Sequence, residues 1–310
     1  MRNDGSNKIF TKSTNIFILA VIATILWGSA YPSVKIGYEL FNISPGDIYG
    51  KILFAGCRFL IAGMLTILIT SILRRKFVYP AKKSILGISV LGLLQTSLQY
   101  IFFYIGLSNT TGVKGAILNS TGTFISVILA HVIYKNDKLN LQKTIGCMVG
   151  FIGVLIINIG GNTAGSGFSF TGEGFIMLAA TTFAFGSIIS KTVAKGEDSM
   201  IMTGYQLFIG GTVLVVIGFT GGGNLATPSF SAIMLLLYMA VLSAVAFTIW
   251  AILLKYNSVG KITIYNFLVP VFGTILSALY LQESIYRLKN IFALICVCLG
   301  IYIVNRKKEG

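Results

Sequence analysis

Long blocks of apolar residues recur along the whole chain, and they constrain its fold more than any other feature. A helix needs about 20 apolar residues to cross the ~30 Å hydrocarbon core of a bilayer. These blocks lack the alternation of apolar and polar residues that the strands of a membrane barrel require. The sequence therefore predicts an all-α integral membrane protein. We expect ten transmembrane helices, at Ile16–Gly37, Ile52–Leu73, Ile85–Leu107, Val113–Tyr134, Thr144–Ile159, Gly174–Ile189, Ile201–Phe219, Ala232–Leu254, Ile262–Leu281 and Asn290–Asn305.

The composition also excludes an ordinary soluble domain. Charged residues make up 11% of the 310 residues and hydrophobic residues 55%, whereas soluble domains carry about 25% charged residues. The fifth, sixth and tenth blocks are short, so nine to eleven helices are compatible with the pattern.

Lys and Arg residues are distributed unevenly between the loops of this predicted topology. One side holds 18 of them and the other side five, and only Arg58 lies well inside a block. Basic loops face the cytoplasm, so we expect both termini there. The net charge of +15 then indicates orientation and attraction to anionic lipid, and not nucleic-acid binding. A chain rich in Ile, Lys and Asn without a long targeting segment suits a bacterial inner membrane.

The middle of the chain carries a glycine-rich connector, Gly160–Glu173, that contains no Lys or Arg. It predicts two halves, residues 1–159 and 160–310, within one membrane domain. Identities between the halves are few, although Asp137 corresponds to Glu283 at a shift of 146 residues. Five helices per half is an odd number, so the second half enters the membrane upside down. Such inverted repeats place a binding site at their interface near the bilayer midplane.

Several segments together carry a family resemblance. They are LWGSAYPSVKIG at the end of the first block, CRFLIAG in the second, LVPVF in the ninth, and a short acidic loop before a glycine-bearing helix at the end of each half. In these features the chain resembles the drug/metabolite transporter superfamily, in its EamA-type ten-helix branch. A departure is Phe124, which stands where the second half has Pro270. The resemblance implies export or import of metabolites, often amino acids, by alternating access across the inner membrane.

Arg58 is the most informative single position. An arginine inside the bilayer costs at least ~2.5–3.5 kcal/mol, so it needs a reason to be there. One interpretation is that it faces a wet cavity and binds a substrate carboxylate or phosphate through its bidentate fork. The other is that it reaches the outer interface or pairs with a loop acid such as Asp47.

Polar side chains in the third and fourth blocks form the next candidate group. Gln95 and Gln99 are four residues apart and share a helix face, and Asn119 opens the polar run NSTGT. Buried amides need partners, which a water-filled cavity provides. The alternative is that they bond to neighbouring helices.

Four aromatic residues, Trp27, Tyr31, Trp250 and Tyr265, lie within the blocks, with Asn266 beside Tyr265. They are candidates for an apolar box around a substrate, and the alternative is ordinary packing or an interfacial belt. Gly28 and Pro32 are candidate gating residues, because proline breaks the helical hydrogen-bond ladder. A static kink explains them equally well.

What is absent from the blocks narrows the function. None contains a deep Asp or Glu, which disfavours a cation/proton drug exchanger. The four cysteines lie in apolar blocks and suggest neither disulfides nor a metal site. The sequence contains no phosphate-binding glycine-lysine loop and no catalytic cluster, so nothing in it indicates an enzyme or a cofactor.

The sequence therefore predicts a secondary transporter for an amino acid or related carboxylate. The alternatives are a nucleotide-sugar or phosphorylated-metabolite exchanger and a passive facilitator. We expect a monomer, with protons as the candidate coupling ion.

Overall fold

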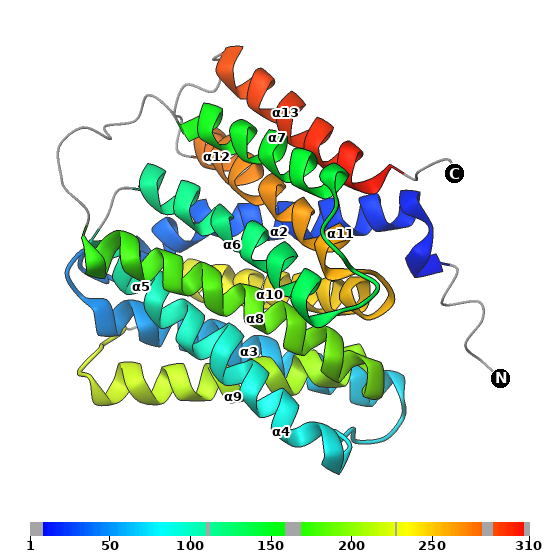
Figure 1. The fold of residues 1–310 in the computed structure, drawn as a ribbon. Coiled ribbons are helices and arrows are strands. Elements are labelled where there is room, and N and C mark those ends of the chain that lie inside the picture. The colour runs from blue at the N-terminus through cyan, green and yellow to red at the C-terminus, as the bar shows by residue number, and fades with distance from the viewer. Residues whose placement is uncertain (1–8, 110–111, 159–168, 227, 281–287, 307–310) are drawn as a thin grey trace.

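The computed structural model describes residues 9–109, 112–158, 169–226, 228–280 and 288–306, which are mostly helical and include no strand (Figure 1). Six helical segments in this part of the chain are long and apolar enough to cross a membrane. They are α2 (Ser13–Leu40), α3 (Ile48–Leu73), the continuous run of α4 (Lys82–Leu91), η1 (Gly92–Leu98) and α5 (Gln99–Ser108), the run of η2 (Phe170–Gly174) and α8 (Phe175–Gly196), α9 (Ser199–Thr220) and α10 (Phe230–Tyr256).

The remaining helices contain shorter apolar stretches of 10–17 residues. They are α6 (Gly112–Ile133), α7 (Leu141–Asn158), α11 (Val259–Thr263), η3 (Ile264–Phe267), α12 (Leu268–Tyr280) and α13 (Leu288–Asn305). The all-α membrane fold is thus confirmed, and the chain crosses the membrane several times. The count of ten spanning helices and the inverted arrangement of the two halves stay predictions.

Side-chain caps explain where several long helices begin. Asp47 accepts a hydrogen bond from the Gly50 nitrogen at 2.7 Å at the start of α3. Asp198 accepts from the Met200 nitrogen at 2.9 Å and fixes the start of α9. Such caps satisfy backbone donors that the first helical turn leaves free. Two of the few acidic residues are therefore used at the loop ends of helices and not within the apolar spans.

Close backbone contact holds α3 against α9. A methyl group added at Gly63 would lie 2.3 Å from the Phe208 nitrogen, and one at Gly211 would lie 2.3 Å from the Leu60 nitrogen. Helix packing in membranes relies on such small residues, because lipid provides no hydrophobic drive for association. The pair α7 and α13 packs in the same way through Gly146 and Gly300.

The other extensive contacts between helices involve α2 and α8. Helix α2 packs against α12 and α10, while α8 packs against α6 and α5. In Figure 1, α7 and α13 lie on one side of the bundle and α3 and α9 on the opposite side. This arrangement places α2, α8 and α10 in the middle, where they carry most of the candidate site.

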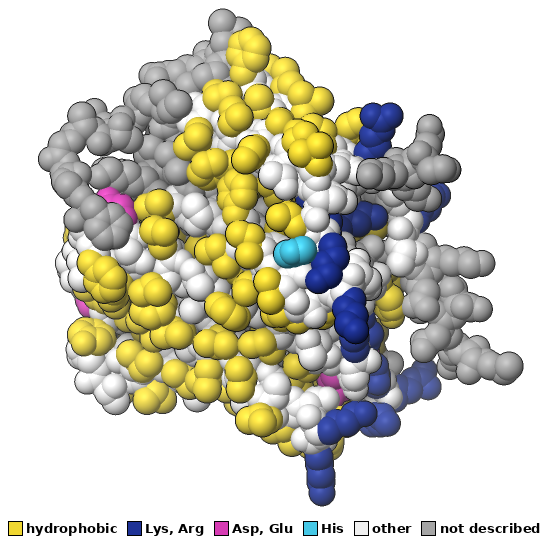
Figure 2. Space-filling model, viewed as in Figure 1, with side chains coloured by type: hydrophobic (Ala, Val, Ile, Leu, Met, Phe, Trp, Pro, Cys, Tyr) yellow, Lys and Arg dark blue, Asp and Glu magenta, His cyan; other side chains and the backbone are white. Residues whose placement is uncertain are grey.

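The outer surface is divided between an apolar belt and a basic edge. Hydrophobic side chains cover most of the face in Figure 2, and Lys and Arg gather along one edge. Many large apolar side chains are exposed, including Leu73 (69%) and Leu86 (75%). Such a surface suits lipid and not water. The start of α2 and the end of α13 lie together, since Ser13 and Arg306 line one groove, and both lie toward that edge in Figure 1.

Candidate functional site

Arg58 lies inside the bundle and not at its surface. Its side chain is 2% exposed, and its Nε donates a hydrogen bond to the Ser243 hydroxyl on α10 at 2.7 Å. The guanidinium lies 4.9 Å from the ring centre of Phe59. Asp47, considered above as a partner, instead caps α3. Among the described residues no carboxylate lies within ion-pair distance of Arg58, so its charge is not neutralised by that part of the protein.

Three tyrosine side chains lie near this charge. Tyr38 on α2 and Tyr100 and Tyr104 on α5 all lie near enough to Arg58 to interact with it electrostatically. Tyr38 and Tyr104 also lie near each other. Arg58 is therefore lined by groups that can share hydrogen bonds with an anion and that carry no opposing charge at neutral pH.

An aromatic cluster lies beside Arg58 and joins five helices. The rings of Trp27 and Trp250 lie 5.0 Å apart, and Trp27 lies 5.4 Å from Phe247. The ring centres of Phe247 and Phe59 lie 6.2 Å apart, and those of Phe59 and Tyr100 lie 4.5 Å apart. Edge-to-face and tilted geometries of this kind are favourable between aromatic rings. With Phe183, which lies 6.5 Å from Trp27, we call these residues the central aromatic cluster: Trp27, Phe59, Tyr100, Phe183, Phe247 and Trp250.

Three polar atoms in or next to the central aromatic cluster have no hydrogen-bond partner in the described part of the chain. They are the indole nitrogens of Trp27 and Trp250 and the amide oxygen of Gln99. Each is buried, and no residue that the structure describes forms a hydrogen bond with it. Buried polar atoms are paired in the great majority of cases, so each exception calls for an explanation such as a water or a ligand.

The two predicted glutamines are used differently. The amide oxygen of Gln95 accepts a hydrogen bond from Gln206 Nε2 on α9 at 3.1 Å, and its side chain packs against Gly186 of α8. Gln95 therefore connects three helices, as the packing interpretation expects. Gln99 lies one turn later, next to Tyr100. Gln95 lies within the π-helical segment η1, and Gln99 follows that segment directly. A π-helical segment is an irregularity that hydropathy does not reveal and that is frequent at functional sites.

Two predicted residues lie outside the aromatic contacts. Asn119 on α6 and Asn266 in η3 are both half-buried, and neither is in ring contact or hydrogen-bond contact with the cluster among the interactions the structure describes. Nearby, the Thr123 hydroxyl donates to the Thr263 carbonyl at 3.3 Å and joins α6 to α11. Substrate binding by Asn119 or Asn266 stays a prediction.

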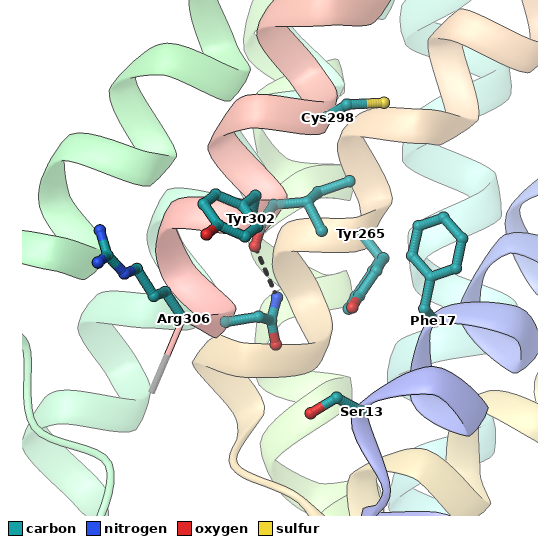
Figure 3. A pocket seen from close by; sticks show the side chains of 8 residues that line it. Ser13, Phe17, Tyr265, Cys298, Tyr302 and Arg306 are labelled. Carbon is teal, nitrogen blue, oxygen red and sulfur yellow. Dashed lines mark hydrogen bonds between the residues drawn. The ribbon is translucent and has the colours of Figure 1, made fainter. Parts of the chain in front are cut away.

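Tyr265 lies apart from Trp27 and Trp250. Its ring packs against Phe17 with centroids 6.4 Å apart, and both residues line a groove of about 280 Å³ between α2, η3 and α13 (Figure 3). Phe17 precedes Trp27 by ten residues, or about 15 Å along a helix. The structure therefore does not bring Tyr265 together with the two tryptophans that were predicted to share its box.

The predicted gating stretch forms a tight contact between α2 and α12. A methyl group at Gly28 would lie 2.7 Å from the Phe272 Cβ, and the ring of Tyr31 packs on Gly273. Helix α2 continues through the buried Pro32 from Ser13 to Leu40. In this conformation the stretch serves packing, and a gating role for Gly28 and Pro32 stays a prediction.

Sequence reasoning gave little weight to a set of polar contacts near the basic edge. The buried Asp137 accepts hydrogen bonds from Lys143 Nζ at 2.6 Å and from the Gly260 nitrogen at 3.1 Å, which joins the loop after α6 to the start of α11. Lys191 donates to the Asn257 carbonyl. Tyr134 donates to the Ile188 carbonyl at 3.1 Å.

These contacts, which we call the basic-edge seal, connect α6, α8, α10 and α11. The acidic loop in the sequence was the only signal that could have found them. In the part of the chain that the structure describes, no three His, Cys, Asp or Glu side chains form a group able to hold a metal.

Comparison with known proteins shows which family this chain resembles. The family model described as "EamA-like transporter family" matches residues 14–159 and 170–306. The uncharacterized transporter YvbV of Bacillus subtilis is 28% identical, with 96% of this chain and 93% of that protein covered. The uncharacterized inner membrane transporter YedA of Escherichia coli is 25% identical, with 91% and 90% covered.

Two further comparisons agree. A chloroplastic WAT1-related protein of Arabidopsis thaliana is 25% identical over 90% of this chain, and the match spans 66% of that protein's length. A solved structure with 14% identity superimposes with a TM-score of 0.77 and covers 94% of this chain and 96% of the other, which shows the fold. The resemblance inferred from the sequence motifs is confirmed, and this multi-pass membrane protein belongs to the EamA-like transporter family.

Proposed function

We propose that this chain is a secondary transporter that moves an amino acid or a related carboxylate across the bacterial inner membrane. The observation that carries the proposal is the buried charge of Arg58 beside the central aromatic cluster, which no carboxylate of the described residues neutralises. Because only Nε is engaged with a described residue, the two terminal nitrogens remain for a carboxylate, which arginine binds in a bidentate manner. A bound anion offsets the cost of burying this charge.

The surrounding groups suggest how the rest of the substrate would be held. The Gln99 amide oxygen is a free acceptor suited to a substrate ammonium group, and the indole nitrogens of Trp27 and Trp250 are free donors. The rings of Phe59 and Phe247 offer an apolar surface to a side chain. Together these groups fit a small zwitterion better than a cation, since Arg58 repels positive charge.

Alternating access is the proposed mechanism, with ten spanning helices in two inverted halves, residues 1–159 and 160–310. Two observations support it. The family model matches one stretch in each half. The helix contacts also correspond between the halves. Helix α2, the first of its half, packs against α12 and α10 of the second half, and α8, the first of the second half, packs against α6 and α5 of the first half. Two similar halves give inward-open and outward-open states of similar energy.

In this scheme both termini face the cytoplasm, and the basic-edge seal closes that side. Asp137 and Lys191 would release α11 and α10 when the site opens inward. Gly28 and Pro32 would allow α2 to bend in the same step. The family and the transporter names of its relatives favour a carrier over an enzyme.

Uptake by proteoliposomes tests the proposal. Purified protein is reconstituted, and accumulation of labelled amino acids is measured with and without an imposed proton gradient. Saturable uptake that unlabelled substrate competes, and that the gradient drives uphill, supports a coupled carrier. Uptake that only equilibrates the two sides indicates a passive facilitator. The test variant is Arg58→Gln, which should lose uptake. Its matched control is Lys83→Gln, at an exposed position, which should keep it.

The arginine fork also fits a phosphate, so vesicles preloaded with phosphorylated metabolites form the second arm. Exchange that requires such an internal substrate would replace the carboxylate by a phosphorylated one. If folded protein transports no carboxylate at all, or if Arg58→Gln transports as well as the unmodified chain, the proposed substrate class is wrong.

A further inference from the structure

The groove that contains Tyr265 has an apolar part and a polar end. Figure 3 shows Phe17 and Tyr265 facing each other, with Cys298 at one end and Ser13 at the other. Phe17 is 49% exposed and Tyr302 is 61% exposed, so the groove opens on the apolar outer surface. It lies where α2 begins and α13 ends, and it therefore reaches the basic edge of the molecule.

Several polar atoms at the end of the groove have no hydrogen-bond partner among the residues that the structure describes. Asn305 Nδ2 donates to the Ile301 carbonyl at 2.9 Å, while its buried Oδ1 has no partner among the described residues. The hydroxyls of Ser13, Tyr265 and Tyr302 likewise form no hydrogen bond with any residue in the described ranges. Arg306 also lines the groove, and in Figure 3 its guanidinium extends away from Ser13 and Tyr265.

We propose that this groove binds an anionic phospholipid. The phosphate lies at the polar end, where the Ser13 and Tyr265 hydroxyls donate hydrogen bonds, and the exposed Arg306 side chain turns toward it on binding and supplies the opposite charge. One acyl chain follows the apolar part, along Phe17, Ile301 and Cys298. Basic pockets between membrane helices are known to bind acidic lipid headgroups in this manner.

Charge and position decide between this occupant and others. No lining residue is acidic, and the exposed Lys12 precedes Ser13, so the local charge favours an anionic headgroup over a zwitterionic one. A soluble anion would leave the apolar part of the groove empty, whereas a phospholipid fills both parts. The lipid would bridge α2 and α13, which come from opposite ends of the chain. This inference does not depend on the transported substrate.

Lipid binding is measured by native mass spectrometry of the delipidated full-length protein, titrated with phosphatidylglycerol or phosphatidylcholine. We expect one tightly bound phosphatidylglycerol per chain and at least roughly tenfold weaker binding of phosphatidylcholine. Arg306→Gln should weaken phosphatidylglycerol binding about tenfold, because it removes a charge-assisted hydrogen bond. The control Lys135→Gln removes one exposed basic charge from another loop and should leave binding unchanged.

A second variant tests the apolar part. Cys298→Trp keeps the charge and fills the groove, so it should abolish the tight site in protein that elutes as a single folded species. Arg306→Gln, at an exposed position, decides the question if Cys298→Trp does not fold. Equal binding of the two lipids, or equal losses in Arg306→Gln and Lys135→Gln, would overturn the proposal. Competition by inorganic phosphate at the lipid's own concentration would also overturn it, because the site would then recognise an anion alone.

Discussion

Two positions on α3, five residues apart, use the interior of the bundle in opposite ways. Gly63 faces α9, and its lack of a side chain lets the backbones of the two helices touch. Arg58 points toward α10, where its charge meets one serine hydroxyl and a ring but no described carboxylate. One face of the helix is packed without polar cost, and the other carries an uncompensated charge.

The difference separates what stabilises this fold from what gives it a function. The α3–α9 interface is held by close backbone contact, and the unpaired polar atom described on α9, the buried Thr203 hydroxyl, lies beside no described charge. The region around Arg58 and the central aromatic cluster contains a buried charge and three polar atoms that no described residue pairs with. Violations of packing and pairing rules are expected at functional sites, where a ligand supplies the missing partner. Substituting both positions with the same residue therefore tests the comparison.

The largest expected effect is on transport by Arg58→Leu. Loss of the guanidinium removes charge-assisted hydrogen bonds worth about 1.5–3 kcal/mol, so we expect uptake of a carboxylate to fall roughly 10- to 100-fold. Unfolding should be unaffected or slightly harder, because replacing a buried charge by an apolar residue is often stabilising. Proteoliposome uptake and the thermal midpoint in detergent are measured on the same preparation. Loss of both in parallel would make Arg58 a structural residue.

The next effect concerns stability. Gly63→Leu forces a side chain into the Phe208 backbone, and overpacking of this kind costs about 1–3 kcal/mol. We expect a lower thermal midpoint in detergent. Gly46→Leu is the control, since no atom lies within 4 Å of a methyl group added at Gly46. If the two leucine variants unfold alike, the α3–α9 contact is looser than its geometry indicates.

Much of the fold, and the importance of Arg58, could be predicted from the sequence. The apolar blocks located the long helices to within a few residues, as Ala232–Leu254 falls inside α10 (Phe230–Tyr256). The sixth block looked too short to span, but α8 continues past it because the buried Lys191 is accommodated by the Asn257 carbonyl. Arg58 stood out because a charge in an apolar block has few explanations.

The rest depended on contacts between distant residues. Phe59, Phe183 and Phe247 complete the central aromatic cluster, yet a phenylalanine in an apolar block gives no signal that separates a site from a core. Tyr265 was predicted to join Trp27 and Trp250, but helix packing places its ring on Phe17 instead. Hydropathy records which residues are apolar and not which neighbours they meet.

The smallest expected effect distinguishes a paired from an unpaired amide within one turn of helix. Gln95→Leu removes the acceptor for Gln206 and leaves its buried donor unsatisfied, which costs about 1 kcal/mol. Gln99→Leu removes an oxygen that has no described partner, so the free energy of unfolding should not fall. The two variants lose the same amide group, and the difference between their thermal midpoints therefore measures pairing.

Transport measurements distinguish the same two glutamine variants. If the Gln99 oxygen accepts a hydrogen bond from the substrate, Gln99→Leu should raise the KM for an amino acid several-fold while stability is kept. Gln95→Leu should show the reverse pattern, with lower stability and a nearly unchanged KM. Equal destabilisation by both variants would mean that a tightly held water already pairs with Gln99, and the polar atoms beside the central aromatic cluster would then lose their value as evidence for a substrate.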